Sequence, residues 1–136
     1  MAAYNKYTAA IEPLLEGINS GTDAWKIALA ATVNAADTTF TAGTTDLATA
    51  GGYTAGGNAA TTTSATQTSG TYKLVLASPT AWTATGSGFT FRYAILWDST
   101  TNTPVGYWDY GSSQAVAAGE TVTVTLDATN GVFQGT

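Results

Sequence analysis

The stretch FTFRYAILW, residues 89–97, places large apolar side chains at every second position. Side chains that alternate with a period of two lie on opposite faces of a β-strand, so this stretch predicts a strand with a buried face. The same alternation occurs in YKLVLA at 72–77 and in VTVTL at 122–126. If the three strands share a core, one set of residues is buried together. This set consists of Phe91, Tyr93, Ile95, Leu74, Leu76, Val122, Val124 and Leu126.

Further short strands are predicted on both sides of this stretch. Residues 25–29 alternate as a half-buried strand does, and similar patterns occur at 105–110 and 132–134. Turn-forming residues separate the strands, most clearly at 98–104. Short strands at regular spacing, joined by turns, are typical of an antiparallel β-sandwich or barrel. We therefore predict a mainly β protein in which residues 23–136 form a single β-sandwich domain.

The N-terminal segment, residues 1–22, has a helical period instead. Apolar residues recur at spacings of three and four, which predicts a short helical arm with a stripe of Tyr7, Ile11, Leu14, Leu15 and Ile18. Pro13 lies within this pattern, where a proline removes a helical hydrogen bond. The helix is therefore either kinked near Glu12 or split, with Pro13 in the first turn of its second part.

This apolar stripe is too large to leave in water, so it predicts a contact surface. We expect the segment from Tyr4 to Ile18 to contact another chain, either a second copy or a different protein. The alternative is that the helix caps the open end of its own sandwich.

The segment from about 32 to 70 is rich in Thr, Ala and Gly. It is either a flexible linker or an ordered region of loops and thin strands. Threonine favours strands, and a structureless loop of this length is unusual within a compact domain. We favour ordered but irregular structure, with a weak strand near 59–67.

Composition excludes several kinds of chemistry. The 136 residues include no Cys and no His, so a thiol nucleophile, the usual zinc sites and a Ser-His-Asp triad are excluded. Four basic residues against nine acidic ones give a formal charge of −5, which does not suit a nucleic-acid backbone. No apolar stretch approaches the roughly 20 residues that span a bilayer. We expect no cofactor, no metal, no nucleic-acid partner and no membrane partner.

The acidic residues offer two further interpretations. Asp98 and Asp109 flank a predicted hairpin and could approach each other as the carboxylate pair of a glycosidase. Asp98 with Ser99, Thr101 and Asn102 could offer oxygen ligands to calcium. Asp98 is expected to form a turn, and Asp109 is expected to lie in water at the end of a strand. We therefore expect no catalytic residue and no enzymatic activity.

Aromatic residues are concentrated where the predicted strands are clearest: Trp82, Trp97, Tyr107, Trp108 and Tyr110. Exposed rings on a β-sandwich could stack on sugars, as in a carbohydrate-binding module. Alternatively, they fill the core and subunit interfaces, because large rings dominate buried area in such places. Half of this chain is Thr, Ala and Gly, so we favour the second interpretation. The predicted interface residues are Tyr4, Tyr7, Ile11, Leu14, Leu15, Ile18, Trp82 and Trp108.

Several motifs resemble a family of small virion structural proteins of tailed bacteriophages. They are YNKY at 4–7, GYTAGGN at 52–58, SGTYKLVLA at 69–77, FRYAILW at 91–97, WDYGS at 108–112 and AAGET at 117–121. Members of this family are often encoded beside the major capsid protein. The resemblance implies a jelly-roll-like fold and a capsid decoration, or cement, protein. Such a protein is made in the host cytoplasm, binds the major capsid protein at the capsid surface and stabilises the head.

On this interpretation the chain is also expected to form a homo-oligomer. A tail or baseplate component is the nearest alternative, and a carbohydrate-binding module is an alternative of a different class.

Overall fold

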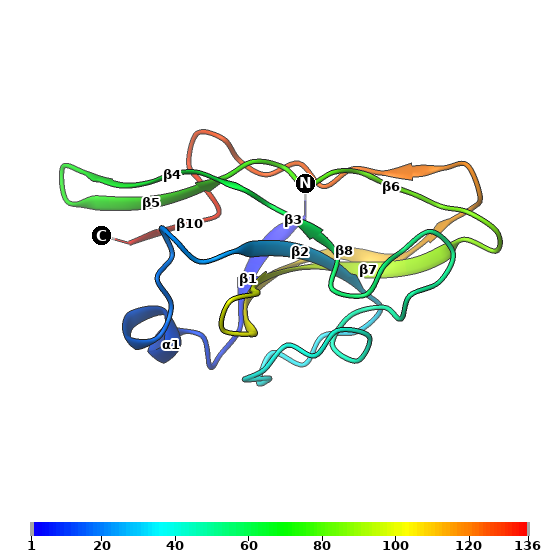
Figure 1. Ribbon diagram of the computed structural model, residues 1–136, viewed down its shortest axis with the longest axis horizontal. Coiled ribbons are helices and arrows are strands. Elements are labelled where there is room, and N and C mark those ends of the chain that lie inside the picture. The colour runs from blue at the N-terminus through cyan, green and yellow to red at the C-terminus, as the bar shows by residue number, and fades with distance from the viewer. Residues whose placement is uncertain (1, 136) are drawn as a thin grey trace.

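Ten strands and one short helix make up the computed structural model, which describes residues 2–135 (Figure 1). All strand pairs are antiparallel, which confirms the predicted mainly β fold with a short N-terminal helix. The elements are β1 (Ala3–Lys6), α1 (Ile11–Glu16), β2 (Trp25–Ala30), β3 (Asn58–Ala59), β4 (Thr62–Thr68), β5 (Thr71–Leu76), β6 (Trp82–Thr83), β7 (Phe89–Asp98), β8 (Thr103–Val116), β9 (Thr121–Val122) and β10 (Phe133–Gly135).

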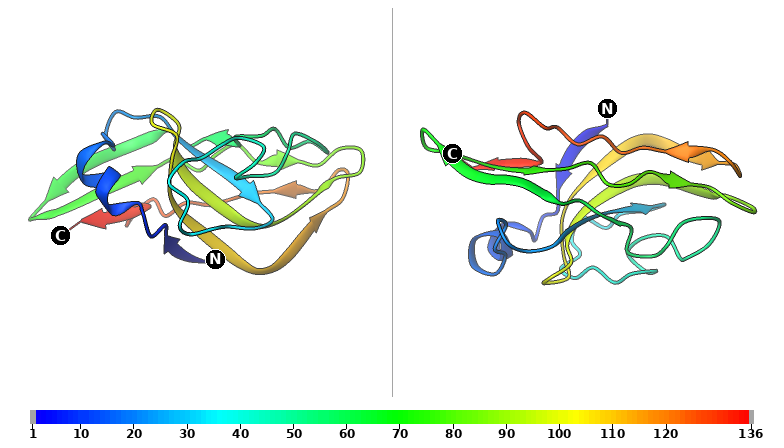
Figure 2. Two further views of the ribbon diagram at one scale, coloured as in Figure 1. Left: turned by 90° about the horizontal axis from the view of Figure 1, so that it is seen from below. Right: turned by 45° about the horizontal axis from the view of Figure 1, so that its top comes forward.

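The strands form two layers. One is a five-stranded sheet in the order β1-β8-β7-β2-β3. The other consists of a three-stranded sheet, β10-β5-β4, and a two-stranded sheet, β6-β9. In Figures 1 and 2 the smaller sheets lie along one side of the five-stranded sheet. Side chains from both layers, among them Ile27, Leu74, Trp82 and Leu96, form one buried cluster, which we call the inter-sheet core.

A second buried cluster covers the opposite face of the five-stranded sheet. We call it the outer-face cluster; it consists of Tyr7, Ala10, Ala28, Ala30, Phe40, Ile95 and Trp97. The Phe40 and Trp97 rings stack with their centroids 3.8 Å apart and their planes 10° from parallel. Strands β2 and β7 are therefore buried on both faces, whereas the sequence pattern predicted a half-buried strand at 25–29.

The predicted core residues of β7 are divided between the two clusters, at a point where the pairing of β7 with β8 is irregular. Phe91 pairs with Gln114 and Tyr93 pairs with Asp109, so the four residues 110–113 of β8 face the single intervening residue of β7. Ala94 and Leu96 lie in the inter-sheet core with Phe91, so the period-two alternation of β7 is broken between Phe91 and Ala94, next to this irregularity. Phe91 lies in the inter-sheet core with Leu74, Leu76, Val124 and Leu126, as predicted. Ile95 is buried in the outer-face cluster instead, and Tyr93 is half-buried against it.

The loop between β2 and β3 covers the outer face and is irregular, as expected for this Thr-rich segment. Its hydrogen bonds converge on the buried Asp46 carboxylate. Asp46 accepts bonds from the Gly43 N–H at 2.7 Å, the Gly56 N–H at 2.6 Å and the Tyr53 hydroxyl at 2.5 Å. The Tyr53 oxygen in turn accepts a bond from the Leu29 N–H of β2. Burial, followed by the bond to Asp46, raises the pKa of Tyr53 well above its usual range, so the hydroxyl stays protonated and keeps donating.

The N-terminal segment is only partly helical. Residues Ala3–Lys6 form the edge strand β1, which pairs with β8, so the first 22 residues are not a separate helical arm. Neither a kinked nor a split helix is observed, because a single helical piece, α1, follows the strand β1. Pro13 is the third residue of α1, within the first turn, where backbone N–H groups have no helical acceptor and a proline removes nothing.

Other expected strands differ in length. The strand predicted over 122–126 pairs only at its start, as β9. The weak strand expected near 59–67 appears as β3 and β4, and the final strand is β10.

The two-sided burial of β7 predicts a large stability loss when Ile95 is truncated. Ile95 is fully buried, so Ile95→Ala leaves a cavity and should lower the free energy of unfolding by about 2–5 kcal/mol. Urea unfolding should show a clearly lower midpoint. Leu15→Ala is the control, because that exposed side chain should change stability by no more than about 0.5 kcal/mol. Equal midpoints for the two variants would contradict the assignment of Ile95 to a closed core.

Candidate functional site

Helix α1 carries the most exposed large aliphatic side chains of the described residues. The chain has twelve leucines and isoleucines, and only Ile11 and Leu15 are classed as exposed, at 47% and 82%. The two are four residues apart in α1 and therefore neighbours on the helix surface. This chain buries nearly all of its other aliphatic side chains, so the adjacent pair Ile11 and Leu15 is the candidate contact surface.

The sequence of α1 favours a helix only weakly, so packing against the rest of the protein has to hold it in place. It has six residues, no side-chain hydrogen bond at its N-terminus and no buried residue of its own. So short a helix is marginal by itself. Leu14 contacts both buried clusters and Ile18 contacts the inter-sheet core. The N–H groups of Gly17 and Ile18 both donate to the Pro13 carbonyl oxygen and close the last turn. Leu14 and Ile18 therefore anchor α1 while Ile11 and Leu15 face outward.

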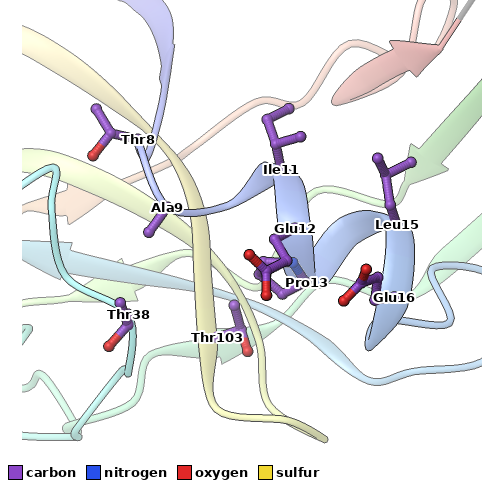
Figure 3. A pocket seen from close by; sticks show the side chains of 9 residues that line it. All are labelled: Thr8, Ala9, Ile11, Glu12, Pro13, Leu15, Glu16, Thr38 and Thr103. Atoms are coloured by element: carbon purple, nitrogen blue, oxygen red, sulfur yellow. The ribbon is translucent and has the colours of Figure 1, made fainter.

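A groove of about 660 Å³ lies beside α1 (Figure 3). We call it the α1 groove; it is lined by Thr8, Ala9, Ile11, Glu12, Pro13, Leu15, Glu16, Thr38 and Thr103. Thr38 comes from the loop that covers the outer face, and Thr103 begins β8. No feature of the sequence pointed to these two threonines, because only the folded loop brings them to the helix.

The α1 groove is acidic as well as apolar. Glu12 and Glu16 both line it and are exposed, and Figure 3 shows them near Ile11 and Leu15 on the same short helix. None of the four basic side chains of the chain lines the groove. The surface therefore combines an apolar pair with two negative charges.

Other predicted interface residues lie inside the chain. Tyr7, Trp82 and Trp108 are all buried, so they build the protein's own core and do not form an exposed surface. Tyr4 is at the edge of exposure, and its ring meets Trp108 edge-on at 5.3 Å between centroids. Of the predicted set, Ile11 and Leu15 remain as surface residues that line a groove.

The tryptophans do not offer a stacking platform for sugars. All four are buried, and among the large rings only Tyr4 and Tyr110 reach 36% exposure. Tyr110 borders a hollow of about 250 Å³ with Trp108 and residues 123–125, which is below the usual size of a ligand pocket. This arrangement agrees with the interpretation that the aromatic residues fill the core.

The two aspartates considered for catalysis lie far apart. Asp98 pairs with Thr103 at one end of the β7–β8 hairpin, whereas Asp109 lies opposite Tyr93, five residues away along β7. Five residues of strand span about 16 Å, beyond the separation used by glycosidases. Asp109 instead forms a two-bond ion pair with Arg92, at 2.8 and 3.1 Å. This pair and the Gly111 N–H hold the pKa of Asp109 below its usual value.

Asp98 forms the turn expected of it. One carboxyl oxygen accepts bonds from the N–H groups of Thr100, at 2.8 Å, and Thr101, at 3.3 Å. The side chain is fully buried, and this burial, together with the neighbouring Asp23 carboxyl, raises the pKa of Asp98 to about 6. Among residues 2–135, no three acidic side chains come together as a metal site would require. The one helix in that part of the chain is too short to cross a membrane.

The raised pKa predicts pH-dependent stability. The folded state favours protonated Asp98, so its contribution is complete below about pH 4 and is lost as the pH rises through about 6. From pH 4 to 7 this group should lower the free energy of unfolding by about 1–3 kcal/mol. Asp98→Asn keeps an acceptor for the two N–H groups without the buried charge and should flatten that decline, as measured by urea titrations at several pH values.

Asp109→Asn is the matched control for this experiment, because it removes a partly exposed carboxylate whose pKa is lowered. The control should retain the decline between pH 4 and 7. An undiminished decline in Asp98→Asn would contradict the role given to this carboxyl group.

Comparison of the chain with protein families, with curated proteins and with solved structures found no match. A functional proposal for this chain therefore rests on its sequence motifs and on the geometry of its residues.

Proposed function

We propose that this protein is a non-enzymatic structural component of a bacteriophage virion, and specifically a capsid decoration protein that binds the major capsid protein. The sequence motifs that resemble small phage virion proteins are the reason for assigning the chain to a virion. The α1 groove supplies the docking surface. The proposal includes association of several copies on the capsid surface, where the protein would stabilise the head.

The exposed pair Ile11 and Leu15 is the observation that carries this proposal. Leu15 exposes 82% of its surface even though Leu14, next to it, packs inward. Burying an exposed leucine or isoleucine side chain against a partner is worth about 1.5–3 kcal/mol. A rigid framework lowers the cost of ordering such residues on binding, and here the anchors of α1 provide that rigidity.

The chemistry of the remaining surface also favours binding over catalysis. Apart from Glu12 and Glu16 on α1, the carboxylates described above have structural partners: Asp46 holds a loop, Asp98 forms a turn and Asp109 pairs with Arg92. A protein that reinforces a particle requires a stable body and a contact surface but no reactive group. The two-layered sandwich with both faces of its central strands covered suits that task.

The proposal predicts that a charge placed at Leu15 abolishes binding to the particle. Leu15→Asp should lower the free energy of unfolding by no more than about 1 kcal/mol, because the side chain is exposed and the added charge near the end of α1 is only mildly unfavourable. It should prevent co-sedimentation with capsids that lack the wild-type protein. Gln67→Asp is the matched control: it adds the same charge at an exposed position of β4, far along the sequence from α1.

Cryo-electron microscopy of the decorated particle tests where the protein lies. Density for it over the major capsid protein would support decoration. Density confined to the tail or baseplate would replace the proposal with that alternative role. Co-sedimentation of Leu15→Asp at the wild-type level would remove α1 from the contact.

A further inference from the structure

We infer that the α1 groove binds a basic, apolar segment of a different protein and does not pair with the same groove of a second copy. The inference takes the contact surface from the proposed function, but the chemistry of the partner comes from the groove itself. It identifies what the docking segment on the other protein must carry.

The helix presents two rows of side chains that run side by side. Ile11 and Leu15 form an apolar row, and Glu12 and Glu16 form an acidic row. Members of each row are four residues apart, so each row extends along one turn of the helix. Figure 3 shows all four side chains on α1 at the groove. A complementary segment has apolar side chains for the first row and cations for the second.

The acidic row has no counter-charge within the groove. The other lining residues are uncharged: Thr8, Ala9, Pro13, Thr38 and Thr103. Glu16 also ends α1, and a negative charge at a helix C-terminus is unfavourable because the carbonyl dipoles there are negative. No basic residue occupies the last turn to offset it. An incoming lysine or arginine would relieve both effects at once.

The same charges disfavour a second copy at this site. Two identical molecules related by a two-fold axis place the same patch against itself. The contact would then bring two copies of Glu12 and two of Glu16 together as the apolar rows are buried. The repulsion grows as water is excluded, so apolar burial in such a dimer is opposed by four clustered carboxylates. A two-fold dimer of the protein would therefore use another surface.

The same reasoning identifies the features of the partner. Its segment carries leucine-, isoleucine- or valine-like side chains with lysines or arginines beside them. The long basic side chains can reach the exposed carboxylates of Glu12 and Glu16 while their methylene groups cover apolar surface. Complementary charge of this kind accelerates association and makes it sensitive to salt.

A pair of short synthetic peptides tests the inference. Both contain the same leucines, one with lysines and the other with glutamates at every charged position. Each is titrated into the ¹⁵N-labelled full chain and followed by NMR. The lysine peptide should shift the amide signals of residues 8–12 and 14–16, Thr38 and Thr103, and its affinity should fall at least about tenfold between low and high salt. The glutamate peptide should leave these signals in place.

A double variant separates the local charges from the overall charge. Glu12→Gln with Glu16→Gln makes the chain two charges more positive and should weaken the lysine peptide about tenfold or more. Thr66→Lys with Thr68→Lys adds the same two charges on the exposed β4 strand, where lysines are tolerated, and should weaken binding far less. Thermal melts should confirm that both variants are folded.

Three outcomes would overturn the inference: equal weakening by the two double variants, equal binding of the two peptides, or a dimer by analytical ultracentrifugation that Leu15→Asp dissociates. The result is also separable from the proposed function. Peptide binding at α1 without any binding to capsids would remove the virion role and leave the inference standing. Capsid binding that depends on Leu15 but is unaffected by Glu12→Gln with Glu16→Gln would support the virion role and overturn the inference.

Discussion

The burial of β7 on both faces is the constraint on which the rest of the structure depends. This strand pairs with β8 on one edge and β2 on the other, and it carries large side chains on both sides. One face is covered by the smaller sheets of the sandwich. The other requires a separate cover, which the irregular loop and the segment around Tyr7 provide. This loop lacks strand pairing over most of its length. Hydrogen bonds to the buried Asp46 carboxylate hold it in place instead.

The position of the candidate site follows from that cover. The chain leaves β1, buries Tyr7 and Ala10 against the outer face and then forms α1 at the margin of the cluster. Leu14 and Ile18 are drawn inward, so the helical period leaves Ile11 and Leu15 on the outside. A weak helix is thereby held in one orientation. Binding of a partner would then lose little conformational entropy, because α1 is already ordered.

Period-two alternation was sufficient to predict the mainly β fold and most of the strands, because it reports directly which side chains face a core. It did not reveal the bulge opposite Arg92, since Gly111 and the two serines after it predict the end of a strand at 110, whereas β8 continues through them to Val116. Strand β1 was missed because its neighbours Tyr7 and Ile11 fit a helical stripe. At the site, Ile11 and Leu15 were predicted from that stripe, whereas Thr38 and Thr103 reach the groove through contacts between distant segments, which local patterns do not encode.

Composition explains why the exposed pair on α1 is informative. Single exposed aliphatic side chains are common on protein surfaces and require no explanation. In this chain, however, small residues fill half the sequence, and the core has to be built from a limited set of large ones, including all four tryptophans. Ile11 and Leu15 are two of the twelve leucines and isoleucines of the chain, and their exposure leaves fewer large side chains to build the core. A contact surface accounts for that placement, and the acidic row beside it limits which partner can use the surface.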